Sequence, residues 1–198
     1  MSSLVGVVLA AGRGERLRPL TDTTPKALLP VRGKPLVDYA IERLRPYVDA
    51  IAVNAHWLHE QLDAHLRDRD VHVEVEQPEA LGTGGALGNL RGWIDGRDVL
   101  VTNADAWYAE PPPPLPHRGI ELLAVDRGEL ADFDTWQYAG MCHMPWSAVK
   151  DLEPVPTGLY EVCWREAWQA NKLELVPYTG TFIDCGTPDD LARANDGG

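Results

Sequence analysis

Short apolar runs alternate with segments of helical periodicity through the first half of the chain. Three apolar runs predict buried strands at residues 4–9, 50–55 and 98–103. A fourth strand is predicted at residues 71–76, where apolar and polar residues alternate. Apolar residues at helical spacing predict helices between these strands, at residues 36–46, 57–67 and 84–93. Because strands alternate with helices, we expect an α/β fold: a Rossmann-like, largely parallel sheet with helices on both faces. In such a sheet, ligands bind at the carboxyl ends of the strands.

The second half of the chain is less regular. Residues 110–116 (EPPPPLP) contain four consecutive prolines, which lack the N–H group that a sheet interior requires. We expect an extended surface segment there, with a proline-motif ligand for a partner domain as the alternative. The remaining predicted elements are strands at residues 119–126, 136–144, 173–178 and 181–184 and helices at residues 158–170 and 187–195. A chain of 198 residues has the length of one domain, so residues 1–198 are predicted to form a single domain.

Charge and composition narrow the function. The net charge of −12 argues against general binding to DNA, RNA or anionic lipid, because all three are polyanions. No stretch approaches the roughly 20 apolar residues of a membrane helix. The apolar run at residues 4–9 follows no basic leader, so a first strand is expected there and not a signal peptide. Three scattered cysteines without a C-x-x-C pair indicate a reducing, cytoplasmic location, and six histidines without ligand spacing do not favour a zinc site.

The longest segment without apolar periodicity follows the first strand, at residues 10–34. A structureless loop longer than about 12–15 residues in a compact domain is usually functional or disordered. Disorder is not favoured here, because residues 28–31 (LLPV) should pack. The loop has two acidic residues, Glu15 and Asp22, and six basic ones: Arg13, Arg16, Arg18, Lys26, Arg32 and Lys34. A local charge of +4 in an acidic chain predicts a site for a polyanion such as a nucleoside triphosphate.

Two glycines near the start of this loop, Gly12 and Gly14, let backbone N–H groups approach phosphate oxygens. The loop is not a Walker A loop, because no Gly-Lys-Ser/Thr follows at the required spacing. It is not a Rossmann dinucleotide fingerprint either, because Leu17 stands at the position of the third glycine. A structural turn explains a lone G-x-G pair equally well, so these two glycines alone do not establish a phosphate-binding loop.

The string LAAGRGERLRPLTDTTPKALLPVRGKP, residues 9–35, resembles the signature of the sugar-1-phosphate nucleotidyltransferases nearly position for position. Three later strings resemble motifs of the same family: QPEALGTGGAL (77–87), VTNADAW (101–107) and FIDCGTPDDL (182–191). The string NAHWLHEQLDAHL (54–66) is most like the small bacterial branch that includes N-acetylmuramate-1-phosphate uridylyltransferase. The resemblance implies the nucleotide-diphospho-sugar transferase type of fold. It also implies a nucleotide-binding half at residues 1–107 and an acceptor-binding half at residues 108–198.

This resemblance implies roles for individual residues. Arg16 matches the arginine that holds the β- and γ-phosphates, and Lys26 matches the lysine at the α-phosphate; these are the catalytic candidates. The nucleotide-binding candidates are Leu9, Ala10, Ala11, Gly12, Arg13, Gly14, Gln77, Gly82 and Thr83. Asp105 and Asp184 match the ligands of Mg²⁺, the implied cofactor. For Arg13 and Arg18 a role as surface charges is an equal alternative, and for Asp105 the alternative is a turn cap.

The late aspartates have separate expected roles. Thr187, Pro188, Asp189 and Asp190 fit the start of a helix, with a capping hydroxyl, a proline and two acids in the first turn. Asp189 and Asp190 are therefore expected to serve that helix. Asp184 lies before the turn at a strand end, so it is the expected metal ligand.

The implied reaction transfers a nucleotidyl group from a nucleoside triphosphate to a sugar 1-phosphate and releases pyrophosphate. The resemblance also favours UTP or CTP, because the string LAAG (9–12) stands where other members of the family have LAGG. The protein is expected to be a monomer or homodimer. The acceptor candidates are Glu161 and Trp136; Trp107 and Trp146 could also line that pocket, with core packing as the alternative.

Two other hypotheses remain. One is a cytidylyltransferase that acts on a phosphorylated amino alcohol or a phosphonate through the same loop. The other is a non-catalytic nucleotide-binding regulatory subunit, which would be marked by the loss of Lys26, Asp105 or Asp184. All three residues are present.

Overall fold

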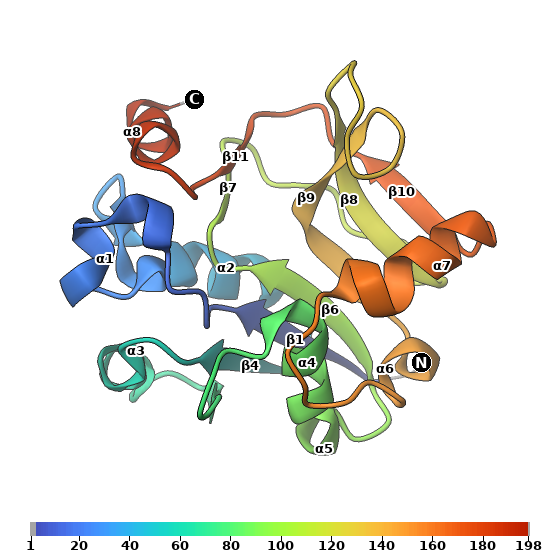
Figure 1. Ribbon diagram of the computed structural model, residues 1–198, viewed down its shortest axis with the longest axis horizontal. Coiled ribbons are helices and arrows are strands. Elements are labelled where there is room, and N and C mark those ends of the chain that lie inside the picture. Colours follow the sequence, from blue (N-terminus) through green and yellow to red (C-terminus); the bar gives the residue numbers. More distant parts are fainter. Residues whose placement is uncertain (1–2, 198) are drawn as a thin grey trace.

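A seven-stranded sheet forms the centre of the computed structural model, which describes residues 3–197 (Figure 1). The two ends of the predicted domain 1–198 lie outside the described residues. The strands, in their order across the sheet, are β10 (Leu173–Pro177), β8 (Ile120–Asp126), β9 (Trp136–Met144), β6 (Asp98–Asn103), β1 (Leu4–Leu9), β4 (Ala50–Ala55) and β5 (His72–Val75). β9 pairs antiparallel with both neighbours, and the other pairs are parallel. The predicted largely parallel sheet is confirmed.

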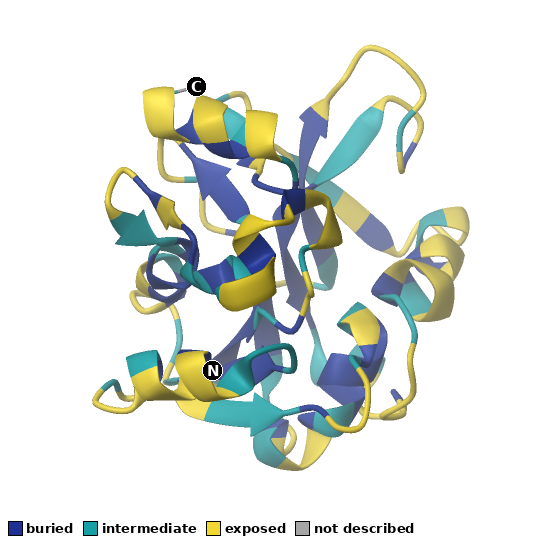
Figure 2. Ribbon diagram, turned by 60° about the vertical axis from the view of Figure 1, so that its left-hand side comes forward, coloured by how far each residue is buried: buried dark blue, intermediate teal, exposed yellow. Residues whose placement is uncertain are grey.

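Helices cover both faces of this sheet. Side chains alternate along each strand, so Val8 and Val53 pack beneath α2 (Leu36–Leu44) and α3 (His59–Leu66), whereas Val7 and Ala52 point to the other face. The elements on that second face are α4 (Gly82–Asn89), α5 (Arg91–Ile94), α6 (Trp146–Val149), the π-turn η3 (Tyr160–Trp164) and α7 (Arg165–Gln169). Figure 2 shows the result: buried strands inside and helices exposed on their outer sides.

Several predicted helix limits are wrong. The helix predicted at 84–93 starts earlier, at Gly82, and is interrupted at Leu90. The helix predicted at 57–67 starts at His59, because Leu58 has a left-handed backbone with φ 52°. The segment predicted as one helix at 158–170 is a π-turn followed by α7.

The loop at residues 10–34 is built from short elements. These are η1 (Glu15–Leu17), α1 (Leu20–Thr23), η2 (Lys26–Leu28) and β2 (Pro30–Val31), which pairs with β3 (Lys34–Pro35). Leu17, Leu29 and Val31 are buried in a third core, so the expected packing of the LLPV string is confirmed. The loop is long because its short elements pack into a separate small layer with its own core.

That third core is closed by segments from far along the chain. β7 (Ala106–Tyr108) pairs antiparallel with β11 (Phe182–Asp184), and α8 (Pro188–Asp196) packs beside them. The three residues of β7 were too few for the apolar pattern to indicate. Thr187 caps α8 as expected: its hydroxyl accepts a hydrogen bond from the Asp190 N–H at 3.2 Å.

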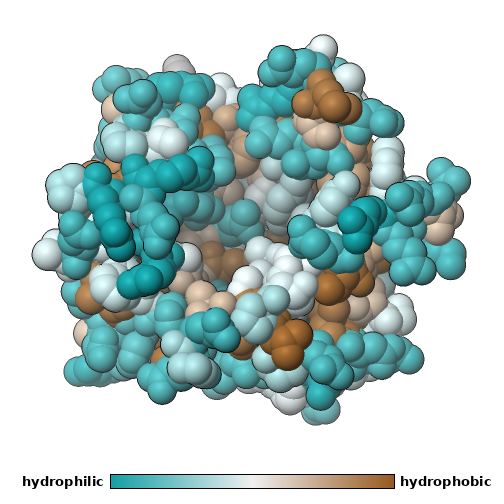
Figure 3. Space-filling view, viewed as in Figure 1, coloured by the Kyte–Doolittle hydropathy of each residue, from teal (hydrophilic) through white to brown (hydrophobic). Residues whose placement is uncertain are grey.

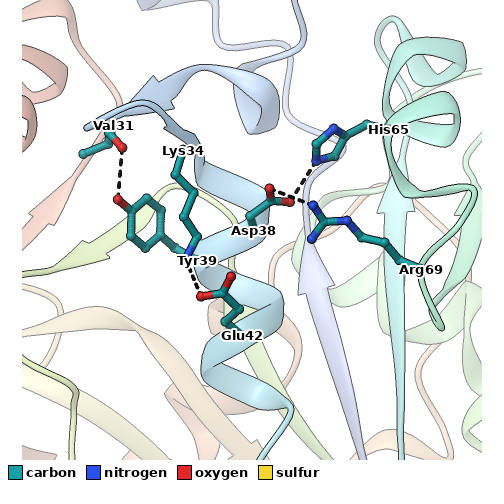
Figure 4. A network of polar contacts seen from close by, with 7 residues as sticks. All are labelled: Val31, Lys34, Asp38, Tyr39, Glu42, His65 and Arg69. Atoms are coloured by element: carbon teal, nitrogen blue, oxygen red, sulfur yellow. Dashed lines mark hydrogen bonds and ion pairs between the residues drawn. The ribbon is translucent and has the colours of Figure 1, made fainter.

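Polar contacts of α2 hold this layer in place (Figure 4). Tyr39 Oη donates to the Val31 carbonyl at 3.0 Å, and Lys34 pairs with Glu42. On the other side of the helix the buried Asp38 accepts a hydrogen bond from Arg69 at 2.9 Å, and its second oxygen lies 2.8 Å from His65 Nε2. The α2 helix therefore connects the loop to α3 and to Arg69, which follow β4.

The proline-rich segment 110–116 is extended, as predicted. Only Leu115 is buried, against the α2 face of the sheet, and most of the prolines are exposed. Tyr178 Oη donates to the Glu110 carbonyl at 2.7 Å, which fixes the start of the segment. Among residues 3–197 no helix has both the length and the apolar character needed to cross a membrane.

Candidate active site

A cleft of about 480 Å³ opens at the carboxyl ends of β1 and β6. Its lining comes from the first strand and loop, from β4, from the start of α4 and from two later turns: Leu9, Ala10, Ala11, Gly12, Gly14, Glu15, Arg16, Lys26, Ala27, Asn54, Ala80, Gly82, Thr83, Asn103, Ala104, Asp105 and Gly186. Figure 3 shows a recess in the middle of this face, with strongly hydrophilic side chains gathered on its left. The position is the one expected for a ligand of a parallel sheet.

Gly14 shapes the loop that forms one wall of the cleft. Its φ of 64° lies in the left-handed region, where side chains are costly. A Cβ at this position would also lie 2.9 Å from Thr21 Cγ2 and 3.1 Å from Lys26 Cβ. Thr21 Oγ1 donates to the Gly14 carbonyl at 2.8 Å, which closes the turn. The glycine therefore brings the first turn of the loop against the backbone that carries Lys26.

Lys26 lies between two carboxylates. Its side chain is mostly buried, and its Nζ forms an ion pair with Asp105 and lies 4.0 Å from Asp184 Oδ1. Asp105 follows β6, and Asp184 ends β11, where it is paired with Ala106 of β7. The Cys185 N–H also donates to the Asp105 carbonyl at 3.0 Å. Two carboxylates from distant parts of the chain are thus held on one cation.

The electrostatics of Asp184 reflect this crowding. Burial raises the pKa of the Asp184 carboxyl, and the neighbouring Asp105 charge raises it further, while Lys26 and Arg16 oppose the rise. Burial likewise raises the pKa of the adjacent Cys185 thiol to about 12, so this thiol stays neutral at pH 7. The negative charges of Asp105 and Asp184 therefore need nearby cations to compensate them.

Arg16 reaches the same place from the loop. A Cβ on Gly186 would lie 2.5 Å from Arg16 Nη2 and 3.2 Å from Asp184 Oδ1, so the guanidinium rests on this glycine beside the carboxylate. Arg16 itself is exposed at the mouth of the cleft. Two cations, Arg16 and Lys26, therefore face the space above Asp105 and Asp184, an arrangement suited to phosphate groups.

The donor set suits a divalent cation that retains water and substrate ligands. Asp105 and Asp184 offer carboxylate oxygens, and repulsion between them is relieved by a shared cation. Within residues 3–197 no group of three or more His, Cys, Asp or Glu side chains converges on one point. Mg²⁺ characteristically binds through one or two carboxylates plus phosphates, so these two residues fit it.

Most of the predicted nucleotide site lines the cleft. The predicted residues that the structure brings together there are Leu9, Ala10, Ala11, Gly12, Gly14, Arg16, Lys26, Gly82, Thr83 and Asp105, with Asp184 joined through Lys26. Arg13 is not among them: its guanidinium lies 4.5 Å above the ring of Trp57. Gln77 is exposed and borders a neighbouring depression with His59 and Asn89.

The predicted acceptor residues do not line the cleft. Trp136 is half-buried at the start of β9 and borders a separate hollow of about 450 Å³ with Tyr178 and Phe182. Glu161 is exposed on the π-turn η3. The other two candidate tryptophans lie elsewhere, since Trp107 is buried in the third core and Trp146 follows the opposite end of β9.

Sequence patterns missed two side chains that matter for the cleft. Asn54 lines it from within β4, and Glu76 is buried directly behind it. Each lies in a run that has the pattern of an ordinary strand, although a polar residue inside the apolar run AIAVNA was a usable signal.

Known proteins are similar to this chain in sequence. Residues 6–112 match the MobA-like NTP transferase domain. The chain is 37% identical over 129 residues to N-acetylmuramate alpha-1-phosphate uridylyltransferase of Caulobacter vibrioides, a match that covers 61% of this chain and 51%, about half, of that protein. It is 29% identical over 220 residues to the Neisseria meningitidis serogroup B protein of the same name, with 95% of each chain covered.

Solved structures share the fold. A candidate glucose-1-phosphate thymidylyltransferase from Bacillus anthracis, in complex with a sucrose, superposes with a TM-score of 0.80 at 20% identity and covers 98% of this chain and 94% of its own. HddC from Yersinia pseudotuberculosis, complexed with GMP-PN, superposes with a TM-score of 0.72 at 19% identity and covers 99% of both chains. Both likenesses run through the second half of this chain as well as the first.

Proposed function

The chain belongs to the family of MobA-like NTP transferase domains, and from this we propose that it transfers a nucleotidyl group from a nucleoside triphosphate to a sugar 1-phosphate, with release of pyrophosphate. The observation that carries the proposal is the convergence of Arg16, Lys26, Asp105 and Asp184 at the mouth of one cleft. The named uridylyltransferase relatives support a sugar 1-phosphate as acceptor.

In the proposed reaction a phosphate oxygen of the sugar 1-phosphate attacks the α-phosphorus of the triphosphate, and the bond to the pyrophosphate oxygen breaks. The attacking phosphate is already anionic near neutral pH, so no side chain has to remove a proton. The difficulty is to bring two anions together and to stabilise charge on the leaving group. Lys26 would meet the α-phosphate, and Arg16 would meet the β- and γ-phosphates. Backbone N–H groups near Gly12 and Gly14 would cradle the same oxygens.

We assign Asp105 and Asp184 to Mg²⁺, on the donor chemistry described above. When bound, the metal would supply charge neutralisation at the triphosphate and at the leaving pyrophosphate. The protein's own part is to hold both carboxylates on one side of the cleft. With the charge of the two carboxylates compensated in this way, Lys26 would be free to leave them and pair with a phosphate.

UTP is the triphosphate we favour, with CTP next, because two relatives are named as uridylyltransferases. An acceptor with an ammonium group is not favoured, because Trp107, Trp136 and Trp146 do not converge on a cage. A non-catalytic role is not favoured either, since Lys26, Asp105 and Asp184 are all present and in contact range. We place the reaction in the cytoplasm; the free thiols of Cys142, Cys163 and Cys185 are consistent with a reducing compartment.

One screen tests the proposal. Pyrophosphate release is measured for each of the four common nucleoside triphosphates and dTTP against a panel of sugar 1-phosphates, with phosphocholine and phosphoethanolamine as other acceptors. Release with UTP and a hexose or amino-sugar 1-phosphate is expected, and chelation of divalent metal should stop it. Release only with the amino-alcohol phosphates, or with no acceptor at all, would contradict the proposal.

A further inference from the structure

Two buried polar side chains form a chain of hydrogen bonds behind the cleft. Asn54 Oδ1 accepts from the Ala10 N–H at 2.6 Å, and Asn54 Nδ2 donates to Glu76 Oε1 at 2.7 Å. The other carboxylate oxygen, Oε2, accepts from the Leu81 N–H at 2.7 Å. Asn54 is 3% exposed and Glu76 is 1% exposed, so water does not compete with these bonds.

This chain of bonds connects two separate walls of the cleft. Ala10 and Ala11 continue β1 into the phosphate loop, whereas Leu81 directly precedes Gly82 and Thr83 at the start of α4. The two walls are about 70 residues apart in the sequence. Main-chain hydrogen bonds join the second wall to the later residue Thr157, which pairs with Leu81, Gly84 and Gly85. The Asn54–Glu76 pair joins the second wall to the first.

The direction of every bond in the chain is determined by its two ends. Both ends are backbone N–H groups, so each end needs an acceptor, and the two side chains between them must supply one internal donor–acceptor contact. An amide paired with an ionised carboxylate does this, and two amides or two ionised carboxylates do not. Burial raises the pKa of Glu76, while the bonds from Leu81 and Asn54 oppose the rise. A buried acid is costly, so its presence here needs a compensating role.

We propose that Asn54 and Glu76 are positioning residues, which set the spacing between the Ala10 and Leu81 walls of the cleft and thereby determine affinity for the triphosphate. The inference rests on the proposed function, because it takes a nucleotide as the ligand between those walls. Neither side chain is placed against a reacting atom. Their effect passes through the backbone of residues 10–12 and 81–83.

The test exchanges the polarity of the pair. Glu76→Gln leaves one N–H group of the new amide facing either the Leu81 N–H or the Asn54 amide group. Asn54→Asp places two carboxylates in contact, and all variants are measured at alkaline pH so that the two do not share a proton. Each single variant should raise the KM and Kd for UTP by about 10-fold, the factor for one buried unsatisfied polar group. The kcat at saturating UTP and the KM for the sugar 1-phosphate should change by less than about 3-fold.

The double variant Asn54→Asp/Glu76→Gln provides the rescue. The new carboxylate at position 54 would accept from the Ala10 N–H and from the new amide at position 76. The carbonyl of that amide would accept from the Leu81 N–H, so all three contacts return with the polarity of the middle one reversed. Affinity for UTP should recover to within about 3-fold of the wild type.

If a single variant does not fold, Asn54→Ser takes its place. This substitution removes the contacts without adding charge, and the same rise in the KM for UTP is expected.

Glu121→Gln is the matched control. Glu121 is also a fully buried carboxylate, and it accepts from the backbone N–H groups of His117, Arg118 and Gly119 at the opposite end of the sheet. Its loss should lower the melting temperature and leave UTP affinity unchanged.

The proposal is overturned if the Asn54 and Glu76 single variants behave as Glu121→Gln does, or if the double variant binds UTP no better than the singles. Calorimetry with UTP alone separates this result from the activity. A wild type that binds UTP but transfers to no sugar 1-phosphate refutes the proposed function only.

Discussion

Lys26 shows how one side chain can have two partners at different stages. In the structure its ammonium compensates Asp105 and Asp184, whereas in the proposed reaction it pairs with the α-phosphate. The backbone turn that carries Lys26 packs against Gly14, so the base of the side chain keeps its position while the ammonium group exchanges partners. A cation that is already desolvated before substrate arrives needs little reorganisation when the phosphate replaces the carboxylate.

Lys26→Ala should therefore lower kcat by about 10²–10³, the scale for the loss of one preorganised electrostatic group. The measurement is pyrophosphate release at saturating substrates. Lys34→Ala is the control, because Lys34 belongs to the same loop but pairs with Glu42 on the surface of α2. A Lys26→Ala enzyme that keeps more than half of the wild-type rate would show that the assigned role is wrong.

Asp184→Asn should separate activity from stability. The variant should lose nearly all activity, because a proposed metal ligand is removed. Its melting temperature without metal should not fall, because a crowded negative charge disappears. Thermal denaturation in chelator and pyrophosphate release with Mg²⁺ give the two readouts. Asp189→Asn, in the first turn of α8, should keep full activity. The reverse pattern, with Asp189→Asn inactive and Asp184→Asn active, would show that Asp189 and not Asp184 is the metal ligand.

Residue by residue, the sequence was most informative where chemistry is concentrated in short motifs. Lys26, Asp105 and Asp184 could be placed because each stands in a string that resembles a family motif. Asn54 and Glu76 could not, because they bind each other and the backbone N–H groups of Ala10 and Leu81, and only the folded chain brings these four groups together. Trp136 and Glu161 were assigned across a poorly matching stretch, and the structure leaves both outside the cleft.

The loop at residues 10–34 behaves as an element although no single part of it is longer than four residues. Its turns are fixed by special backbone positions and by contact with β7, β11 and α8. Periodicity could predict the long strands and helices, since those repeat one backbone conformation. It could not predict this layer, whose order comes from packing between segments that are far apart in sequence.

Gly14→Ala tests that view of the loop. The substitution should destabilise the protein by more than Gly33→Ala, which strains a similar backbone (φ 79°) but meets no neighbouring atom. About 1–2 kcal/mol is expected at Gly33 from the left-handed conformation alone. At Gly14 the contacts with Thr21 and Lys26 add to this cost, and kcat should fall because Lys26 is displaced. Urea unfolding and pyrophosphate release measure the two effects; equal losses in both variants would contradict the packing role of Gly14.

At the scale of the whole molecule, the proposed nucleotide site is assembled mainly from the first 107 residues and completed by Asp184 and Gly186. The fold class followed from the strand–helix alternation alone, and the observed strand order supports it. The sequence could not locate an acceptor pocket, because the second half of the chain departs from the family pattern in the stretch that would line it. Triphosphate binding should therefore be separable from acceptor binding.

A triphosphate with Mg²⁺ should stabilise the protein without any acceptor. At a concentration 100 times its Kd, a ligand that binds only the folded state adds about 2.7 kcal/mol, which corresponds to a rise of roughly 5–10 °C in Tm for a chain of this size. Arg16→Ala should reduce the shift, and Glu161→Ala should retain it. If the shift needs the sugar phosphate, or if Glu161→Ala abolishes it, the two sites are not independent.

The pairing of β7 with β11 also sets an order of events during synthesis. At about 5–20 residues per second, the ribosome needs roughly 4–15 s to extend the nascent chain from residue 107 to residue 184. Over that interval the nascent chain contains Lys26 and Asp105 but not yet Asp184. The proposed pair of metal-binding carboxylates is therefore complete only after β11 has been translated and has paired with β7.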